Sequence, residues 1–242
     1  YNPFINEVID KLVFIVMNRR NIIYYITIVL VIAGIYGITR MKTTGYMVDD
    51  LKETDPIRQD LAFFESNFDG LMPLEVTIDF LKPNQVFKLS NLEKLDQLNT
   101  ELSQDPDLSK ALSVVEAAKF ANQAYYNGKA SYYKLPSNMT KNFIMKYVME
   151  STGGMNDMAK SFVDSTMREV RLSFRVKDIG TKKMEAKEDS LYKIIEKIFP
   201  PDKHHTSVTG SSVIFFKGNQ YLIKNLFSSL ALAIVLIASF MA

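Results

Sequence analysis

The chain has 242 residues, a formal net charge of +2 and no cysteine. The near balance of charge argues against a nucleic-acid-binding surface, which normally carries a strong basic excess, and the lack of cysteine excludes disulfides, thiol catalysis and thiolate metal sites. Much of the 47% hydrophobic content lies at the two ends. The middle is charged, rich in turn residues and long enough to build a core.

Residues 1–20 are predicted to form an amphipathic helix at the membrane interface. Between Phe4 and Met17, apolar residues recur at helical spacing and the opposite face is polar. Such a helix just before a membrane span suits the interface, although its polar face is not rich in lysine or arginine. Packing against soluble protein therefore remains the alternative.

Residues 21–39 are uncharged and are predicted to form a transmembrane helix. At roughly 1.5 Å per residue they cross roughly 28 Å, close to the hydrocarbon thickness of a bilayer. A buried helix of a soluble protein is the alternative, which so long a charge-free run disfavours. Arg19 and Arg20 precede the run, so the positive-inside rule places its N-terminal side in the cytoplasm. We therefore expect residues 40–224 to be extracytoplasmic.

The middle of the chain alternates predicted helices and strands. Asp55 and Pro56 begin a helix as its cap and first residue, and later helices are expected to follow caps at Ser90 and Thr181. Four strands are expected from alternating, β-prone residues. They are Leu74–Phe80, Leu108–Val115, Met167–Lys177 and a short strand around Val208.

Residues 116–161, rich in tyrosine, asparagine and methionine, are interpreted as a helical insertion. Without them the order is strand, helix, strand, strand, helix, strand, which is the split βαβ or ferredoxin-like arrangement. Its antiparallel sheet carries both helices on one face. The expected fold class is thus an α+β membrane protein, with two transmembrane helices flanking an extracytoplasmic ferredoxin-like domain.

Residues 206–242 are expected to join this domain to a second span. Gly210 follows the last strand as a turn, and Ser211 or Ser212 is expected to cap the next helix. Residues 225–242 are free of charge and about as long as the shortest membrane-spanning helix. We expect this span to be truncated at Ala242 and the chain to be a piece of a larger membrane protein.

The sequence points to no catalytic, cofactor-binding or metal-binding site, and we expect no enzyme activity and no cofactor. His204 and His205, its only histidines, are interpreted as part of a solvated loop before a strand rather than as ligands. Asp49 and Asp50 fit a solvated turn better than a cation site. The glycosylation sequon at Asn138 matters only in a eukaryotic secretory context.

Two further features bear on function. The tyrosines and methionines of the insertion could line an apolar groove, although ordinary helix packing is the preferred interpretation. Neither uncharged run contains an aspartate, glutamate, histidine, lysine or arginine. Because proton relays need such residues within the membrane, any energy coupling must lie in spans outside this chain.

Two segments resemble a known family. FFESNFDGLMPLEVTIDF (Phe63–Phe80) and the stretch from Val208 to Ala242 are similar to the lipid-exporter-like (MMPL) branch of the resistance-nodulation-division (RND) superfamily of transporters. The resemblance covers nearly the whole chain. It implies two repeats in twelve spans of a bacterial inner-membrane protein, with substrate passing through extracytoplasmic porter domains and protons passing through carboxylates in other spans.

The resemblance implies as partners the remaining spans and second repeat, membrane lipids, a hydrophobic substrate, and a second copy of the protein or other envelope proteins. It assigns no substrate-binding residue. Two other classes stay open: a MacB-like or FtsX-like transmembrane subunit coupled to a cytoplasmic ATPase, and a two-span sensor with an extracytoplasmic ligand-binding domain. Sequence beyond Ala242 would separate the three.

Overall fold

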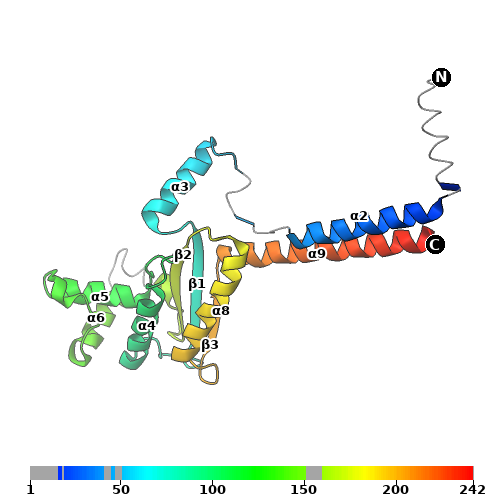
Figure 1. Ribbon diagram of the computed structural model, residues 1–242. Helices are drawn as coiled ribbons and strands as arrows, with labels where there is room; N and C mark the ends of the chain where they lie inside the picture. Colours follow the sequence, from blue (N-terminus) through cyan, green and yellow to red (C-terminus); the bar gives the residue numbers. More distant parts are fainter. Residues whose placement is uncertain (1–15, 18, 41–44, 47–50, 151–159, 242) are drawn as a thin grey trace. The chain divides into compact units, whose positions relative to one another are not determined.

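The computed structural model describes residues 16–17, 19–40, 45–46, 51–150 and 160–241 (Figure 1). The chain divides into two compact units, residues 1–43 and 44–242. In the first unit the described residues include helix α2, Arg20–Arg40. The predicted amphipathic helix of residues 1–20 lies almost wholly outside the described residues, and the pair Asp49-Asp50 lies wholly outside them.

The second unit combines helices with one antiparallel sheet, so the protein has a mixed α+β organisation. The strands are β1 Met72–Asp79, β2 Glu169–Val176 and β3 His205–Thr209, in the order β2-β1-β3. The helices are α3 Pro56–Phe68, α4 Leu89–Leu102, α5 Val114–Tyr125, α6 Asn138–Glu150, α8 Gly180–Ile198 and α9 Ser211–Met241, with a short 3-10 helix η1 at Ala130–Tyr132.

Alternation of side chains decides which face of the sheet is buried. In β1 every second residue from Met72 to Ile78 is buried, whereas the residues between them are at least partly exposed. Val76 pairs with Leu172 of β2 and with Val208 of β3, so apolar side chains of all three strands share one face. The other face carries polar side chains, as antiparallel sheets commonly do.

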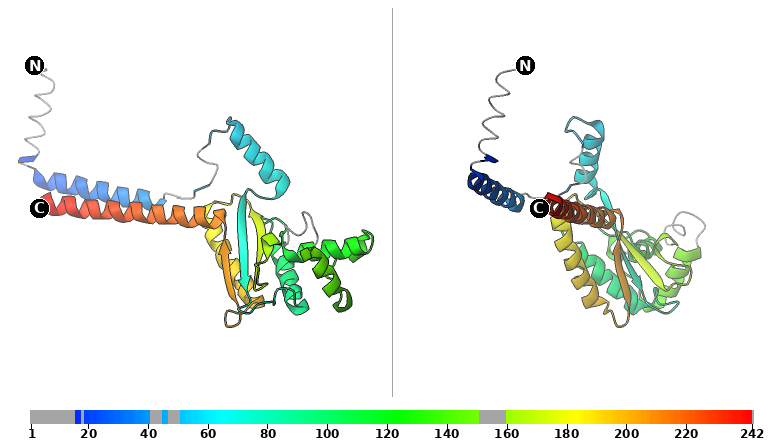
Figure 2. Two further views of the ribbon diagram at one scale, coloured as in Figure 1. Left: turned by 180° about the vertical axis from the view of Figure 1, so that it is seen from behind. Right: turned by 90° about the vertical axis from the view of Figure 1, so that its right-hand side faces the viewer.

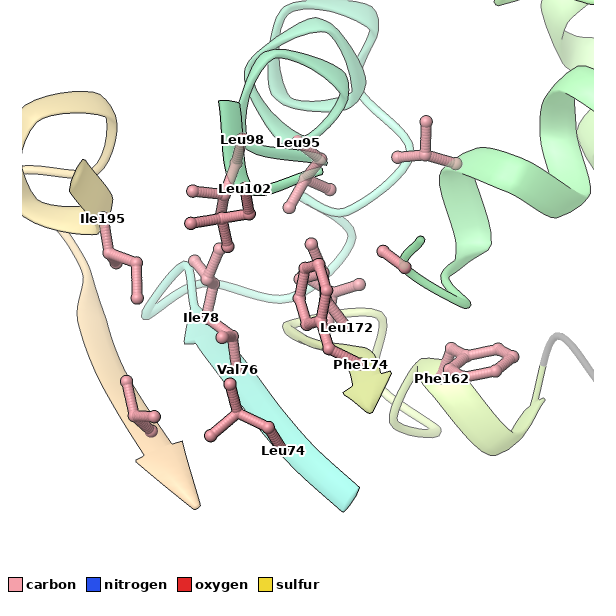
Figure 3. Close-up of a cluster of buried hydrophobic side chains, with 14 of the residues drawn as sticks. Leu74, Val76, Ile78, Leu95, Leu98, Leu102, Phe162, Leu172, Phe174 and Ile195 are labelled. Carbon is pink, nitrogen blue, oxygen red and sulfur yellow. The ribbon is translucent and has the colours of Figure 1, made fainter. Parts of the chain in front are cut away.

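Helices α4 and α8 cover the apolar face and contact each other. Figure 3 shows Leu98 and Leu102 of α4 and Ile195 of α8 directed at the side chains of β1, while Phe174 of β2 lies beside them. All four side chains are almost completely buried. The leucines that recur at helical spacing in α4 are therefore part of the core.

The expected four-stranded sheet is wrong, because Leu108–Val115 forms no strand. Only two isolated bridges, Leu108 to Val176 and Leu112 to Ser173, run along the outer edge of β2. Between them the hydroxyl of Ser109 accepts the N–H of Arg175 at 2.9 Å. A side chain thus replaces a main-chain carbonyl in the ladder, and α5 begins soon afterwards at Val114.

Helix α3 has the predicted start, but α4 does not have the predicted cap. Asp55 accepts the N–H of Ile57 at 2.9 Å, and Asp69 ends α3 with a left-handed φ of 55°. Helix α4 starts at Leu89, directly after Lys88, which makes no side-chain cap hydrogen bond. The expected Ser90 cap is therefore wrong, since Ser90 already lies in the first helical turn.

Candidate functional site

Two helices are long and apolar enough to cross a membrane. The qualifying stretches are Asn21–Ile38 of α2 and Ser211–Phe240 of α9. Apart from Ser212, Val213 and Phe216 at the start of α9, their described side chains are not buried. Their exposed isoleucine, leucine and valine side chains would be unfavourable in water over so large an area. The two helices are thus weakly consistent with association with a membrane.

Strand β3 passes into α9 through a single residue. Gly210 has a φ of 108°, which confirms the predicted glycine turn, and its carbonyl accepts the N–H of Ile214 at 3.1 Å as the first helical hydrogen bond. A Cβ on Gly210 would collide with the carbonyl oxygen of Pro73. The expected serine cap is wrong, because Ser211 is already the first residue of α9 and the hydroxyl of Ser212 donates to the Pro73 carbonyl at 2.8 Å.

Polar contacts hold the first turns of α9 against α8. The ammonium of Lys217 lies 2.7 Å from a carboxylate oxygen of Glu188, whose side chain is largely buried. One turn further along, the amide of Gln220 donates to Glu185 at 3.0 Å. These contacts fix the direction in which α9 leaves the domain.

The chain segment after α2 also reaches this junction. Gly45 and Thr181 bond reciprocally: the Gly45 N–H donates to the Thr181 hydroxyl at 3.2 Å, and the Thr181 N–H donates to the Gly45 carbonyl at 3.1 Å. The predicted Thr181 cap is therefore wrong, since α8 starts at Gly180 and the hydroxyl serves Gly45 instead. A Cβ on Gly45 would lie against the amide end of the Asn219 side chain, which would have to move.

An apolar groove lies between α5 and α6, which sit side by side (Figures 1 and 2). Its volume is about 280 Å³. It is lined by Ala121, Ala124, Tyr125, Phe143 and Ile144. The structure contains both features considered for the tyrosine-rich insertion, ordinary helix packing and an apolar groove. Ile144 is buried between the packed helices, and an open groove remains beside it.

A polar cluster joins α4 to α5 and to the segment after η1. The largely buried Lys119 lies 2.5 Å from Asp96 and 3.0 Å from Glu116. Tyr133 donates to the other oxygen of Glu116 at 2.5 Å. A cavity of about 290 Å³ adjoins the cluster and includes Asn99 in its wall.

The protonation of this cluster points to a structural role. Burial by itself lowers the pKa of Lys119, but hydrogen bonds to Asp96 and Glu116 outweigh it and raise that pKa above its ordinary value. Burial, together with the Glu116 carboxylate, raises the pKa of Tyr133 to about 12. Because both groups keep their protons near neutral pH, the cluster fits a tie between helices better than acid–base chemistry.

The two histidines have different surroundings. His205 is exposed on β3, but His204 is only 8% exposed, which contradicts its assignment to a solvated loop. The His204 ring packs edge-on against Phe80 and Phe199, with centroids 5.5 Å and 5.2 Å away. Burial lowers the pKa of His204 below the ordinary 6.5. In the part of the chain that the structure describes, no three histidine, aspartate or glutamate side chains gather as metal ligands.

Asn138, the acceptor of the sequon, is exposed at the first residue of α6. Comparison of the chain with models of protein families and with curated proteins finds no match.

Proposed function

We propose that this chain supplies two transmembrane spans and an extracytoplasmic porter domain to an RND-type, MMPL-like transporter of a bacterial inner membrane. The transporter exports lipids or other hydrophobic compounds. Protons drive it through carboxylates in spans outside this chain, and the remaining spans and a second repeat complete it.

The observation that carries the proposal is the direct passage from sheet to candidate span. Strand β3 ends at Thr209 and α9 begins at Ser211, from which one helix of 31 residues runs to Met241. The contacts of Lys217 and Gln220 with α8 leave little freedom at this junction. A movement of the domain would therefore be transmitted along α9, as transport by porter domains requires.

The strand order supports a ferredoxin-like assignment for the domain. From one edge to the other, the order is β3, β1 and β2, followed by the bridges at Leu108 and Leu112. Counting the bridged segment as a reduced second strand gives the order of a split βαβ unit, with α4 and α8 as its two helices. A domain of this kind between two apolar helices is the arrangement that the resemblance implies.

The composition of the two candidate spans supports the proposal that proton coupling takes place in spans outside this chain. Residues 21–39 and 225–242 contain no aspartate, glutamate, histidine, lysine or arginine. Because an intramembrane proton path needs ionisable groups, these spans act as mechanical and positional elements. The protons move through other spans of the complete transporter.

The test is gradient-driven movement of a lipid. The complete protein, reconstituted in phosphatidylcholine liposomes, should move a fluorescent fatty acid when a proton gradient is imposed, and a protonophore should abolish the movement. This chain reconstituted alone should move none. Transport that needs ATP and a cytoplasmic partner would support the MacB-like class instead, and gradient-driven transport by this chain alone would overturn the proposal.

A further inference from the structure

The groove between α5 and α6 is open on its apolar side. The rings of Tyr125 and Phe143 lie 5.5 Å apart and form one wall, yet they are 52% and 63% exposed. Ala121 and Ala124 leave the space beside them unfilled. An apolar cavity of about 150 Å³ can hold a benzene molecule, so the 280 Å³ of this groove have room for a longer apolar group.

Further exposed apolar side chains lie on the same helix faces as the groove lining. Phe120 stands four residues before Ala124 in α5, and Met139 stands four residues before Phe143 in α6. Scattered exposed apolar residues need no explanation, but several gathered around a groove mark a place where a ligand or partner binds. None of the described residues that line the groove is charged, so the part of the ligand that enters it must be apolar.

The charge of the surrounding chain defines the other end of the ligand. Residues 117–149 contain five lysines and no aspartate or glutamate. Lys119 is neutralised by Asp96 and Glu116. Lys141 lies three residues before Ile144 in α6, a spacing that places it on the groove side of the helix. An apolar groove with Lys141 on its side of α6 complements a molecule with an apolar tail and an anionic head.

We propose that the α5–α6 groove binds one anionic single-chain amphiphile, such as a fatty acid. Its hydrocarbon chain lies in the space beside Ala121 and Ala124, against the wall that Tyr125 and Phe143 form, and its carboxylate lies near Lys141. A groove with walls favours a single molecule over a flat bilayer surface, which would need apolar side chains spread over a plane. The role of this binding as substrate capture rests on the proposed transport function, whereas the binding itself does not.

Binding can be measured without transport, so the two proposals can fail separately. This chain in phosphatidylcholine liposomes is irradiated with a diazirine-bearing decanoate, and the labelled peptides are identified by mass spectrometry. We expect adducts in α5 and α6 that decanoate displaces and that decanol and decyltrimethylammonium do not. Adducts in α9, from probe dissolved in the bilayer, serve as the internal standard.

Matched variants locate the site. Ala124 is exposed in the groove, so Ala124→Phe should fill it and reduce the α5–α6 adducts by about tenfold, while Ala130→Phe in η1 leaves them unchanged. Lys141→Glu should reduce them about threefold and Lys141→Arg should not. Equal displacement by decanol would overturn the anionic preference. Adducts that persist in Ala124→Phe would indicate contact with the membrane surface and would overturn the proposal that the probe binds in the groove.

Discussion

His204 shows how one residue gains its role from burial rather than from its chemistry. Its ring fills a space between Phe80 and Phe199, and its Nδ1 lies 3.3 Å from the carbonyl oxygen of Pro200. Desolvation disfavours the charged imidazolium in such a site. The residue therefore acts as a part of the core next to β3, and its protonation opposes folding.

This arrangement predicts a pH dependence of stability. Because the folded pKa of His204 is lowered below 6.5, the unfolded chain binds the proton more readily. The contribution of His204 to the free energy of unfolding should therefore be complete above pH 6.5 and decrease as the pH falls below 6.5. The variant His204→Phe should lose this pH dependence of the free energy of unfolding, whereas the variant His205→Phe, at the exposed neighbouring residue, should keep it. Urea denaturation at a series of pH values checks this. An equal change of the unfolding free energy with pH in both variants would contradict it.

Single-residue roles were the least predictable from the sequence. The pair His204-His205 indicates that one ring faces inward if the strand is extended, but not which one or against what. Thr181 is a good cap by type, yet its hydroxyl bonds Gly45, which lies 136 residues earlier. Such choices depend on which distant backbone groups arrive at the site, and local pattern does not contain that information.

At the scale of elements, prediction succeeded where one strong pattern dominated. Strands β1 and β2 alternate apolar and polar residues over eight positions each, and α4 repeats leucine at helical spacing. The segment from Leu108 to Val115 has no such long, regular pattern of apolar residues. There Ser109 bonds Arg175 through its side chain and Val114 begins α5, so two local preferences outweighed a short apolar run.

The junction between β3 and α9 should tolerate little change. Gly210 combines a φ of 108° with close packing, because a Cβ would lie 3.1 Å from the Cα of Leu74 and closer still to Pro73. Gly210→Val should therefore destabilise the domain by about 1–3 kcal/mol and impair transport by the complete protein without preventing membrane insertion. Thermal unfolding and transport measure the two effects.

Gly218 provides the matched control for this variant. It lies in α9, the helix that follows Gly210, and a Cβ there would meet no neighbouring atom within 4 Å. Gly218→Val should change stability by less than about 1 kcal/mol, the range of helix propensities. If Gly210→Val retained normal stability and transport, Gly210 would be a tolerant surface turn and would have no part in coupling the domain to α9.

At the scale of the whole molecule, composition predicted more than local pattern did. The two long apolar runs stand out in the sequence, and both form helices that could cross a membrane. The candidate binding groove could be predicted only as a helical segment rich in tyrosine and methionine. Its existence depends on how Tyr125 of α5 packs against Phe143 of α6, a register that neither helix specifies alone.

The orientation of the chain in the membrane gives the last prediction. Arg19 and Arg20 precede the first apolar run, so the positive-inside rule predicts that the domain lies outside the cytoplasm. Because the chain has no cysteine, Lys129→Cys introduces a unique thiol at an exposed position. It should react with an impermeant maleimide in cells whose outer membrane alone is permeable, whereas Ile234→Cys in α9 should need detergent. Labelling of Lys129→Cys only after the inner membrane is opened would reverse the topology and remove the domain from any route of export.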